Sequence, residues 1–214
     1  MLSGFSVQEK GCFQDINLYR IFKGNKLPYL WKLWELVLTN QPIMVVSDLP
    51  SECSETVLGL LSTICPLEYQ TDYKPYFTIY DPEYREIQDL YDQKIAKCAI
   101  IGVTNPLFLK TMENYPNIFH LEKDYLKSKK AKAAKKTSLL ESLQKTYTLP
   151  DPNLKKMFMN VDTEEVDAIN NALLKKSLQS LTESFLSIFQ IYFKLQINVR
   201  KRLFFHILNF INRI

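Results

Sequence analysis

Apolar side chains recur at helical spacing in two segments of the first hundred residues. Pro28 can open the first helix, because a residue in the first turn has no intrahelical N–H bond to lose. The turn Thr39–Pro42 then ends this helix. Ser51 is the expected N-cap of the second helix, which has one apolar face and stops at Pro66.

Short runs of apolar, aromatic or β-branched residues alternate with these helices and predict strands. The runs are Ile43–Val46, Tyr76–Tyr80, Cys98–Val103 and Ile118–Leu121. A further helix is expected between the last two runs, from Leu107 to Tyr115. Continuous apolar runs are typical of strands that are covered on both faces. The alternation therefore predicts an α/β fold with a central, mostly parallel sheet flanked by helices.

Residues 81–97 are mostly polar and carry many acidic side chains, so they predict a surface loop with at most a helical turn. The carboxylates lack the spacing of metal ligands, and we favour a solvated loop over a metal or acid–base site.

The second half of the chain changes character. Residues 123–160 contain the lysine-rich stretch Lys127–Lys136 and predict a basic linker or an exposed helix. Clustered lysines are also attracted to anionic lipid headgroups, so a peripheral membrane contact is the alternative. A long C-terminal helix begins near Asp162, and its apolar strip indicates packing on the domain rather than a coiled coil.

These patterns divide the chain into four parts. We expect a central α/β lobe at 1–122, a lysine-rich linker at 123–160, a helical segment at 161–194 and a divergent apolar and basic tail at 195–214.

Candidate chemistry is sparse. The five glycines form no phosphate-binding loop, and no nucleophile elbow is present. The two histidines, His120 and His206, lack ligand-spaced partners, and we expect His120 to be structural. The four cysteines lack zinc or redox spacing and are expected to be reduced and mostly buried. No catalytic residue, metal site or cofactor is therefore predicted.

Charge and hydropathy add two expectations. The net charge of +4 is modest and gives no basic stripe, so no nucleic-acid partner is expected. The N-terminus lacks a secretory signal pattern, and charged residues interrupt the apolar C-terminal tail, so no clear membrane span is expected.

Several of these segments, in this order, resemble the central DENN domain of the DENN domain-containing protein 6 subfamily. They are Cys12–Tyr19, Leu33–Leu36, Gln41–Val45, Ser51–Leu61, Pro75–Ile79, Gly102–Phe108 and Leu173–Phe185. The resemblance covers about residues 12–192, apart from the lysine-rich stretch.

The resemblance implies a guanine-nucleotide exchange factor for a Rab GTPase in endosomal membrane trafficking, with Rab14 as the subfamily's associated partner. It also implies a cytoplasmic protein that is recruited to recycling endosomes. Such a factor acts by binding and opening the Rab switch regions, so it needs no covalent chemistry. The alternative is a non-catalytic DENN-type module that binds a Rab or another trafficking partner.

Loops at strand ends are the expected Rab contacts, because sheets of this type carry their sites there. We predict that the partner-binding residues are Tyr80, Asp81, Pro82, Thr104, Asn105 and Pro106. The alternative is that Pro75, Tyr76, Gly102 and Asn105 determine the fold, with Gly102 allowing a close backbone approach.

The sequence departs from the subfamily at both ends. An upstream longin-like lobe has no counterpart before Cys12, and the composition after about Lys194 is typical of an AT-rich intron or a shifted frame. We therefore expect an incomplete copy, from a truncated gene model or a splice product. If the tail is genuine, its alternating basic and apolar residues could lie on a membrane surface.

Overall fold

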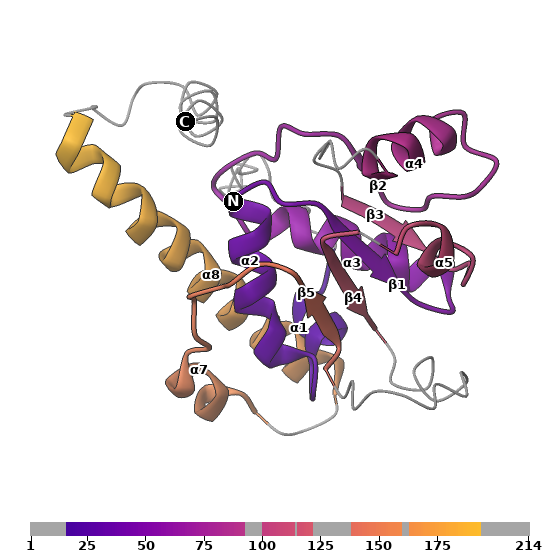
Figure 1. Cartoon of the computed structure of the whole chain (residues 1–214). Helices are drawn as coiled ribbons and strands as arrows, with labels where there is room; N and C mark the ends of the chain where they lie inside the picture. The colour runs from indigo at the N-terminus through magenta and orange to yellow at the C-terminus, as the bar shows by residue number, and fades with distance from the viewer. Residues whose placement is uncertain (1–15, 93–99, 114, 122–137, 160–162, 194–214) are drawn as a thin grey trace, which may run out of the picture.

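The computed structural model of the chain describes residues 16–92, 100–113, 115–121, 138–159 and 163–193 (Figure 1). The helices are α1 (Leu18–Phe22), the 3-10 helix η1 (Leu27–Tyr29), α2 (Leu30–Leu38), α3 (Pro50–Ser62), α4 (Tyr84–Asp92), α5 (Phe108–Thr111), α7 (Pro152–Met157) and α8 (Glu164–Phe193). The strands are β1 (Ile43–Val46), β2 (Tyr73–Lys74), β3 (Ile100–Val103), β4 (Asn117–His120) and β5 (Leu140–Ser142).

The strands form one sheet with the order β2-β3-β1-β4-β5. Strands β2, β3, β1 and β4 are parallel, whereas β5 pairs antiparallel with β4 at the edge. In the central register Val45 lies opposite both Gly102 and Phe119. The expected α/β fold with a mostly parallel sheet and a long C-terminal helix is confirmed.

Helices cover both faces of the sheet (Figure 1). On one face Val45 and Ile100 belong to a core that also contains buried residues of α1, α2, α3 and α8. On the other face Val46 and Ile101 pack with Phe108 of α5 and Ile87 of α4. All four residues of β1, β3 and β4 are buried, which explains the apolar sequences of β1 and β3 and the apolar centre, Ile118 and Phe119, of β4.

Helix α8 packs against the α/β body along much of its length, from Leu173 to Leu186. Leu174 and Leu178 are buried in the same core as α1 and α2, as the apolar strip predicts. The indole Nε1 of Trp34 donates a hydrogen bond of 3.0 Å to Oγ1 of Thr182, which in turn donates to the Leu178 carbonyl. A buried polar link therefore joins α2 to α8 across 148 residues of sequence.

Two predicted elements near the second strand are wrong. Residues 76–80 do not form a strand, because the chain turns after Lys74 and buries Phe77 against Tyr84 and Phe108. The segment 81–97 is not a loop throughout, since α4 occupies Tyr84–Asp92. Ile87 is buried in the core, but its neighbours in the sequence are mostly charged. The apolar periodicity is therefore too weak to predict this helix from the sequence.

Smaller differences concern the ends of elements and the cysteines. Helix α3 has Leu49 as its N-cap and Pro50 in its first turn, so Ser51 lies inside the helix rather than at the cap. Cys65 forms a disulfide, so the expectation of reduced thiols is wrong there, whereas Cys53 is free and buried. Within 123–160 the structure has strand β5, which the sequence pattern does not predict, and the short helix α7, which follows the lysine-rich stretch.

Within the part of the chain that the structure describes, no helix is both long and apolar enough to cross a lipid bilayer. The lysine-rich stretch Lys127–Lys136 and the tail 195–214 lie outside the described residues. The four-part division of the chain remains a prediction.

Candidate functional site at the carboxyl edge of the sheet

The carboxyl ends of β1 and β3 lie side by side, and the chain leaves them in opposite directions. The loop after β1 leads to α3 on one face of the sheet, and the loop after β3 leads to α5 on the other face. Adjacent parallel strands with such diverging connections create a topological switch point, where open α/β sheets place their binding sites. The loops after Val46 and Val103 are therefore the expected position of a binding site in this fold.

The loop after β1 is held in place by its own polar groups. The Ser47 amide donates to the Val103 carbonyl at 3.3 Å, which ties the loop to β3. The Ser47 hydroxyl donates to Oε2 of Glu52 at 2.7 Å and accepts from the Leu49 amide at 3.3 Å. These bonds fix the backbone on both sides of Leu49, whose side chain remains 52% exposed.

The loop after β3 is also ordered by local hydrogen bonds. Oδ1 of Asn105 accepts from the Leu107 amide at 2.9 Å, and the Asn105 carbonyl accepts from the Phe108 amide at 3.1 Å. Phe108 is buried, so the turn is anchored in the core while Asn105, Pro106 and Leu107 face the solvent. Asn105 thus shapes the turn and is exposed on it.

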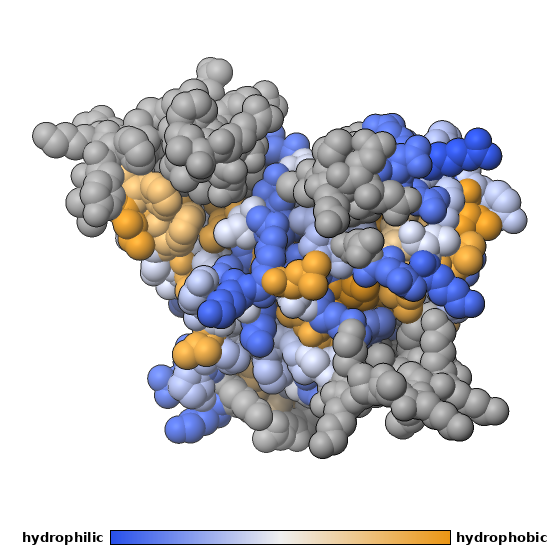
Figure 2. Space-filling view, viewed as in Figure 1, coloured by the Kyte–Doolittle hydropathy of each residue, from blue (hydrophilic) through white to orange (hydrophobic). Residues whose placement is uncertain are grey.

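Tyr76 joins the segment after β2 to the same edge. The hydroxyl groups of Tyr76 and Thr104 lie 3.3 Å apart and share a hydrogen bond. Tyr76 is 43% exposed and Leu107 is 40% exposed, although both are large apolar or aromatic side chains. The carboxyl-edge surface consists of Leu49, Tyr76, Thr104, Asn105, Pro106 and Leu107. Figure 2 shows apolar side chains reaching the surface on the side that carries α5.

Gly102 lets the segment after β2 approach the sheet closely. A Cβ placed on Gly102 would lie 2.2 Å from the Pro75 carbonyl oxygen and 3.1 Å from Cβ of Cys53. The Gly102 carbonyl also accepts from the Phe77 amide at 2.7 Å. The expectation that Gly102 allows a close backbone approach is confirmed, and this approach positions Tyr76 beside Thr104.

Cys53 lies beneath the site and is not poised for chemistry. Its thiol is buried and donates to the Val103 carbonyl at 3.2 Å. Burial raises the pKa of Cys53 to about 11. A thiol with so high a pKa is almost wholly protonated at neutral pH and is a poor nucleophile.

Tyr80, Asp81 and Pro82 form a second loop, on the α4 side of the sheet. Tyr80 is 88% exposed, and Oδ2 of Asp81 accepts from the Thr78 amide at 3.1 Å. No hydrogen bond or ion pair between described residues joins this loop to Thr104. The structure thus places Thr104, Asn105 and Pro106 on one surface, and the role of Tyr80–Pro82 stays a prediction.

The sequence pattern does not identify three exposed members of the carboxyl-edge surface. Leu49 follows the first strand, and Leu107 was expected only as the start of a helix. Tyr76 was expected within a strand. Leu49 lies three residues after the end of β1, so a search for large apolar residues in the loop that follows each predicted strand would have found it.

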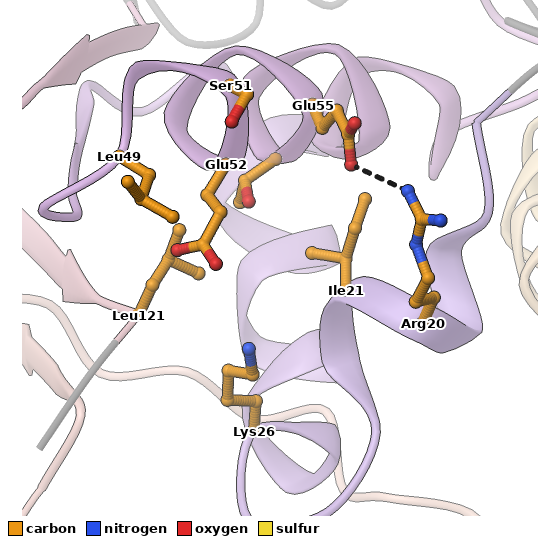
Figure 3. Close-up of a pocket in the computed structure, with 9 residues that line it drawn as sticks. Arg20, Ile21, Lys26, Leu49, Ser51, Glu52, Glu55 and Leu121 are labelled. Carbon is orange, nitrogen blue, oxygen red and sulfur yellow. Dashed lines mark hydrogen bonds and ion pairs between the residues drawn. The ribbon is translucent and has the colours of Figure 1, made fainter. Parts of the chain in front are cut away.

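A pocket of about 370 Å³ adjoins this surface at Leu49 (Figure 3). Its walls come from α1, the turn after α1, the first half of α3 and the end of β4. The lining residues are Arg20, Ile21, Lys26, Leu49, Ser51, Glu52, Glu55, Thr56 and Leu121. Arg20 and Glu55 form an ion pair of 3.3 Å across its rim.

Other chemistry-bearing side chains lie away from this edge or within the fold. Over the described ranges, no three His, Cys, Asp or Glu side chains gather in a way that could hold a metal ion. His120 is buried at the end of β4, and its Nε2 lies 3.9 Å from Oε1 of Glu141 on β5. This position between two strands supports the structural role expected for His120.

Comparison with known proteins identifies the family of this chain. The family model described as Stabilization of polarity axis matches residues 18–130, and the chain belongs to this family. Protein DENND6A of Gallus gallus is 36% identical over 184 residues, which are 80% of this chain and 31% of that protein.

Further relatives support the DENN domain-containing protein 6 subfamily that the sequence resembles. Protein DENND6B of Homo sapiens is 31% identical over 80% of this chain and 31% of its own length. The DENND6 homolog of Dictyostelium discoideum is 31% identical over 88% of this chain and 32% of its own length. The chain therefore spans about a third of the length of these relatives.

Proposed function

We propose that this chain is part of a guanine-nucleotide exchange factor for a Rab GTPase, and that it binds the GTPase through the carboxyl-edge surface. The observation that carries this proposal is the switch point itself, where Leu49, Tyr76 and Leu107 are exposed on ordered loops. Membership of the DENND6 subfamily supports an exchange factor rather than an enzyme with covalent chemistry.

The proposed mechanism is differential binding. A factor accelerates GDP release when it binds the open, nucleotide-free GTPase more tightly than the closed GDP form. Each tenfold difference in affinity shifts that equilibrium by about 1.4 kcal/mol. The protein needs only a preformed surface for this task, and the hydrogen-bonded loops around Ser47 and Asn105 supply one.

The exposed side chains are suited to act as anchors. Aromatic residues in particular are enriched at the energetic centres of protein interfaces, where polar neighbours provide the rim. Leu107 and Tyr76 are the apolar centre of this surface, and Thr104 and Asn105 are its polar neighbours.

The experiment measures release of fluorescent GDP from a panel of Rab GTPases, including Rab14, with and without the chain. We expect faster release from at least one Rab. Leu107→Asp places a charge at the centre of the surface and should reduce the acceleration at least tenfold. Leu149→Asp is the matched control, because Leu149 is 81% exposed and is not part of the carboxyl-edge surface.

Two outcomes would contradict the proposal. The first is that the chain neither binds any Rab of the panel nor accelerates GDP release. The second is that Leu107→Asp and Leu149→Asp retain the same activity.

A second candidate function is a module that binds a Rab or another trafficking partner without accelerating exchange. The coverage of the relatives favours it, since this chain matches only about 31% of the length of DENND6A and DENND6B. Detectable Rab binding with an unchanged rate of GDP release would support this module and exclude exchange by the chain itself.

We also propose that the chain acts in the cytoplasm at recycling endosomes, as the subfamily resemblance implies. Lys127–Lys136 would contribute a peripheral membrane contact through anionic headgroups. Co-sedimentation with phosphatidylserine vesicles, compared with phosphatidylcholine vesicles, tests that contact. Equal binding to both kinds of vesicle would count against it.

A further inference from the structure

Residues 143–149 form an extended segment, called the outer strap below, that passes over α2 on its way from β5 to α7 (Figure 1). The backbone of the outer strap is bonded to α2, because Oε2 of Glu35 accepts from the Tyr147 amide at 2.8 Å. Both ends are anchored, since Leu140 before the strap and Leu154 after it are buried in the core that contains α2. The outer strap is therefore a fixed part of the molecular surface.

Side chains along the outer strap alternate between two directions. Thr146 and Thr148 are half-buried, whereas the residues between and beside them are exposed. Successive side chains of an extended chain point to opposite sides, so every second residue shares the outward side. The outward residues are Leu143, Lys145, Tyr147 and Leu149.

Three of these outward side chains are large and almost wholly in solvent. Leu143 is 80% exposed, Tyr147 is 79% exposed and Leu149 is 81% exposed. Figure 2 shows apolar side chains at the surface on this side of the molecule. Apolar side chains grouped on an ordered surface mark a site for a partner protein or a membrane.

Positive charge is concentrated in the same part of the sequence. Residues 127–159 contain nine lysines and only two acidic residues, Glu141 and Asp151. The net charge of the whole chain is only +4, so the remainder contains more acidic than basic residues. Lys145 lies among the three exposed apolar side chains, and the exposed Lys156 follows on α7. The partner of the outer strap must therefore be anionic and must also accept apolar side chains.

We propose that the outer strap inserts Leu143, Tyr147 and Leu149 into the interfacial region of an anionic membrane. Leucine side chains enter the boundary of the acyl chains, tyrosine rings favour the headgroup level, and lysine side chains extend to anionic headgroups. A protein partner that adds a strand is less suited, because Glu35 already occupies the amides of Tyr147 and Thr148. The proposal deepens the membrane contact proposed above for Lys127–Lys136, because it adds an apolar part to that contact.

Quenching of tryptophan fluorescence by lipid tests insertion on the 214-residue chain. The probe is a vesicle of phosphatidylserine and dibrominated phosphatidylcholine, whose bromine atoms quench a nearby indole. We expect the emission that Leu149→Trp adds to fall by about half on binding, while the buried Trp31 and Trp34 supply a constant background. Tyr80→Trp is the matched control, because Tyr80 is 88% exposed but lies on the α4 side of the sheet. The emission that it adds should not change.

Co-sedimentation with phosphatidylserine vesicles separates the apolar contact from the electrostatic one. Replacing Leu143 and Leu149 together with serine removes apolar surface without changing the charge. This serine variant should bind the vesicles at least about tenfold more weakly than the wild type, whereas Tyr80→Ser should bind as the wild type does. Replacing the six lysines within Lys127–Lys136 with glutamine should weaken binding and reduce its salt dependence, but the bound protein should still show quenching of Leu149→Trp.

The outcomes distinguish the outer strap from the other proposals. The inference is overturned if Leu149→Trp is not quenched in bound protein, or if the serine variant binds as tightly as the wild type. Either result with salt-sensitive binding would retain the contact of Lys127–Lys136 and remove only its apolar part, whereas the absence of all vesicle binding would defeat both. Self-association that the serine variant abolishes, without vesicle binding, would assign the strap to a second copy of the chain and overturn the inference. The assay of GDP release contains no lipid, so its result is independent of these outcomes.

Discussion

Replacing Gly102 with alanine should destabilise the protein more than any other conservative change on β3. The added Cβ would lie 2.2 Å from the Pro75 carbonyl oxygen, whereas an ordinary van der Waals contact lies between 3.4 and 4 Å. The two backbones must therefore separate by about 1 Å. Cys53 limits that movement, because its Cβ lies 3.1 Å from the same position.

The cost follows from the rigidity of the neighbours. Overpacking a well-packed core costs about 1–3 kcal/mol, and a backbone carbonyl cannot rotate away as a side chain can. The Phe77 amide bond to the Gly102 carbonyl would be strained by the same movement. We expect a loss of about 3 kcal/mol, which lowers the midpoint of thermal unfolding by about 6–12 °C in a chain of this size.

Thermal and urea unfolding, followed by circular dichroism, measure this loss. Gly59→Ala is the matched control on α3. Its Cβ would meet the movable side-chain atom Cδ2 of Leu18 at 3.0 Å, and alanine gains about 1 kcal/mol over glycine inside a helix. If Gly102→Ala is as stable as Gly59→Ala, the close approach at Pro75 does not constrain the fold, and the reasoning fails.

Two further changes test other parts of the core. Thr182→Val should lower the free energy of unfolding by about 1–2 kcal/mol in urea titrations, because the buried Trp34 indole loses its hydrogen-bond acceptor. Thr182→Ser keeps a hydroxyl at this position and should therefore retain most of the wild-type stability. The raised pKa of Cys53 means that the unfolded chain releases the thiol proton first as the pH rises from about 9 to about 11. Stability should therefore fall over that range more in the wild type than in Cys53→Ala, and parallel pH profiles would contradict this.

The sequence predicts the centre of the sheet because β1, β3 and β4 are buried on both faces. Such strands favour consecutive apolar residues, as in Ile43–Val46 and Ile100–Val103, whereas β4 contributes the apolar pair Ile118 and Phe119 between Asn117 and His120. The run Tyr76–Tyr80 shares the composition of a strand, but only Phe77 is fully buried, while Ile79 packs against the core from the side and Tyr76 remains partly exposed. Composition alone does not separate these two cases.

Only the part of the candidate site that follows β3 can be predicted from the sequence. Thr104, Asn105 and Pro106 follow a recognisable strand, so a loop at a strand end is expected there. The neighbours Leu49 and Tyr76 join them only because the sheet order is β2-β3-β1, which brings three strand ends together. That order arises from crossovers between distant segments and is not encoded in local periodicity.

Variants in and just after β3 differ in whether they test the fold or the partner-binding surface. Gly102 supports Tyr76 through the backbone contact at Pro75, so a loss of Rab binding in Gly102→Ala would not distinguish a damaged fold from a lost contact. Leu107 lies only five residues later, yet its side chain is 40% exposed and outside both cores. Leu107→Asp should therefore leave the unfolding transition within about 0.5 kcal/mol of the wild type. Normal stability combined with lost binding would assign the effect to the surface itself, whereas a destabilised Leu107→Asp would show that this loop is part of the core.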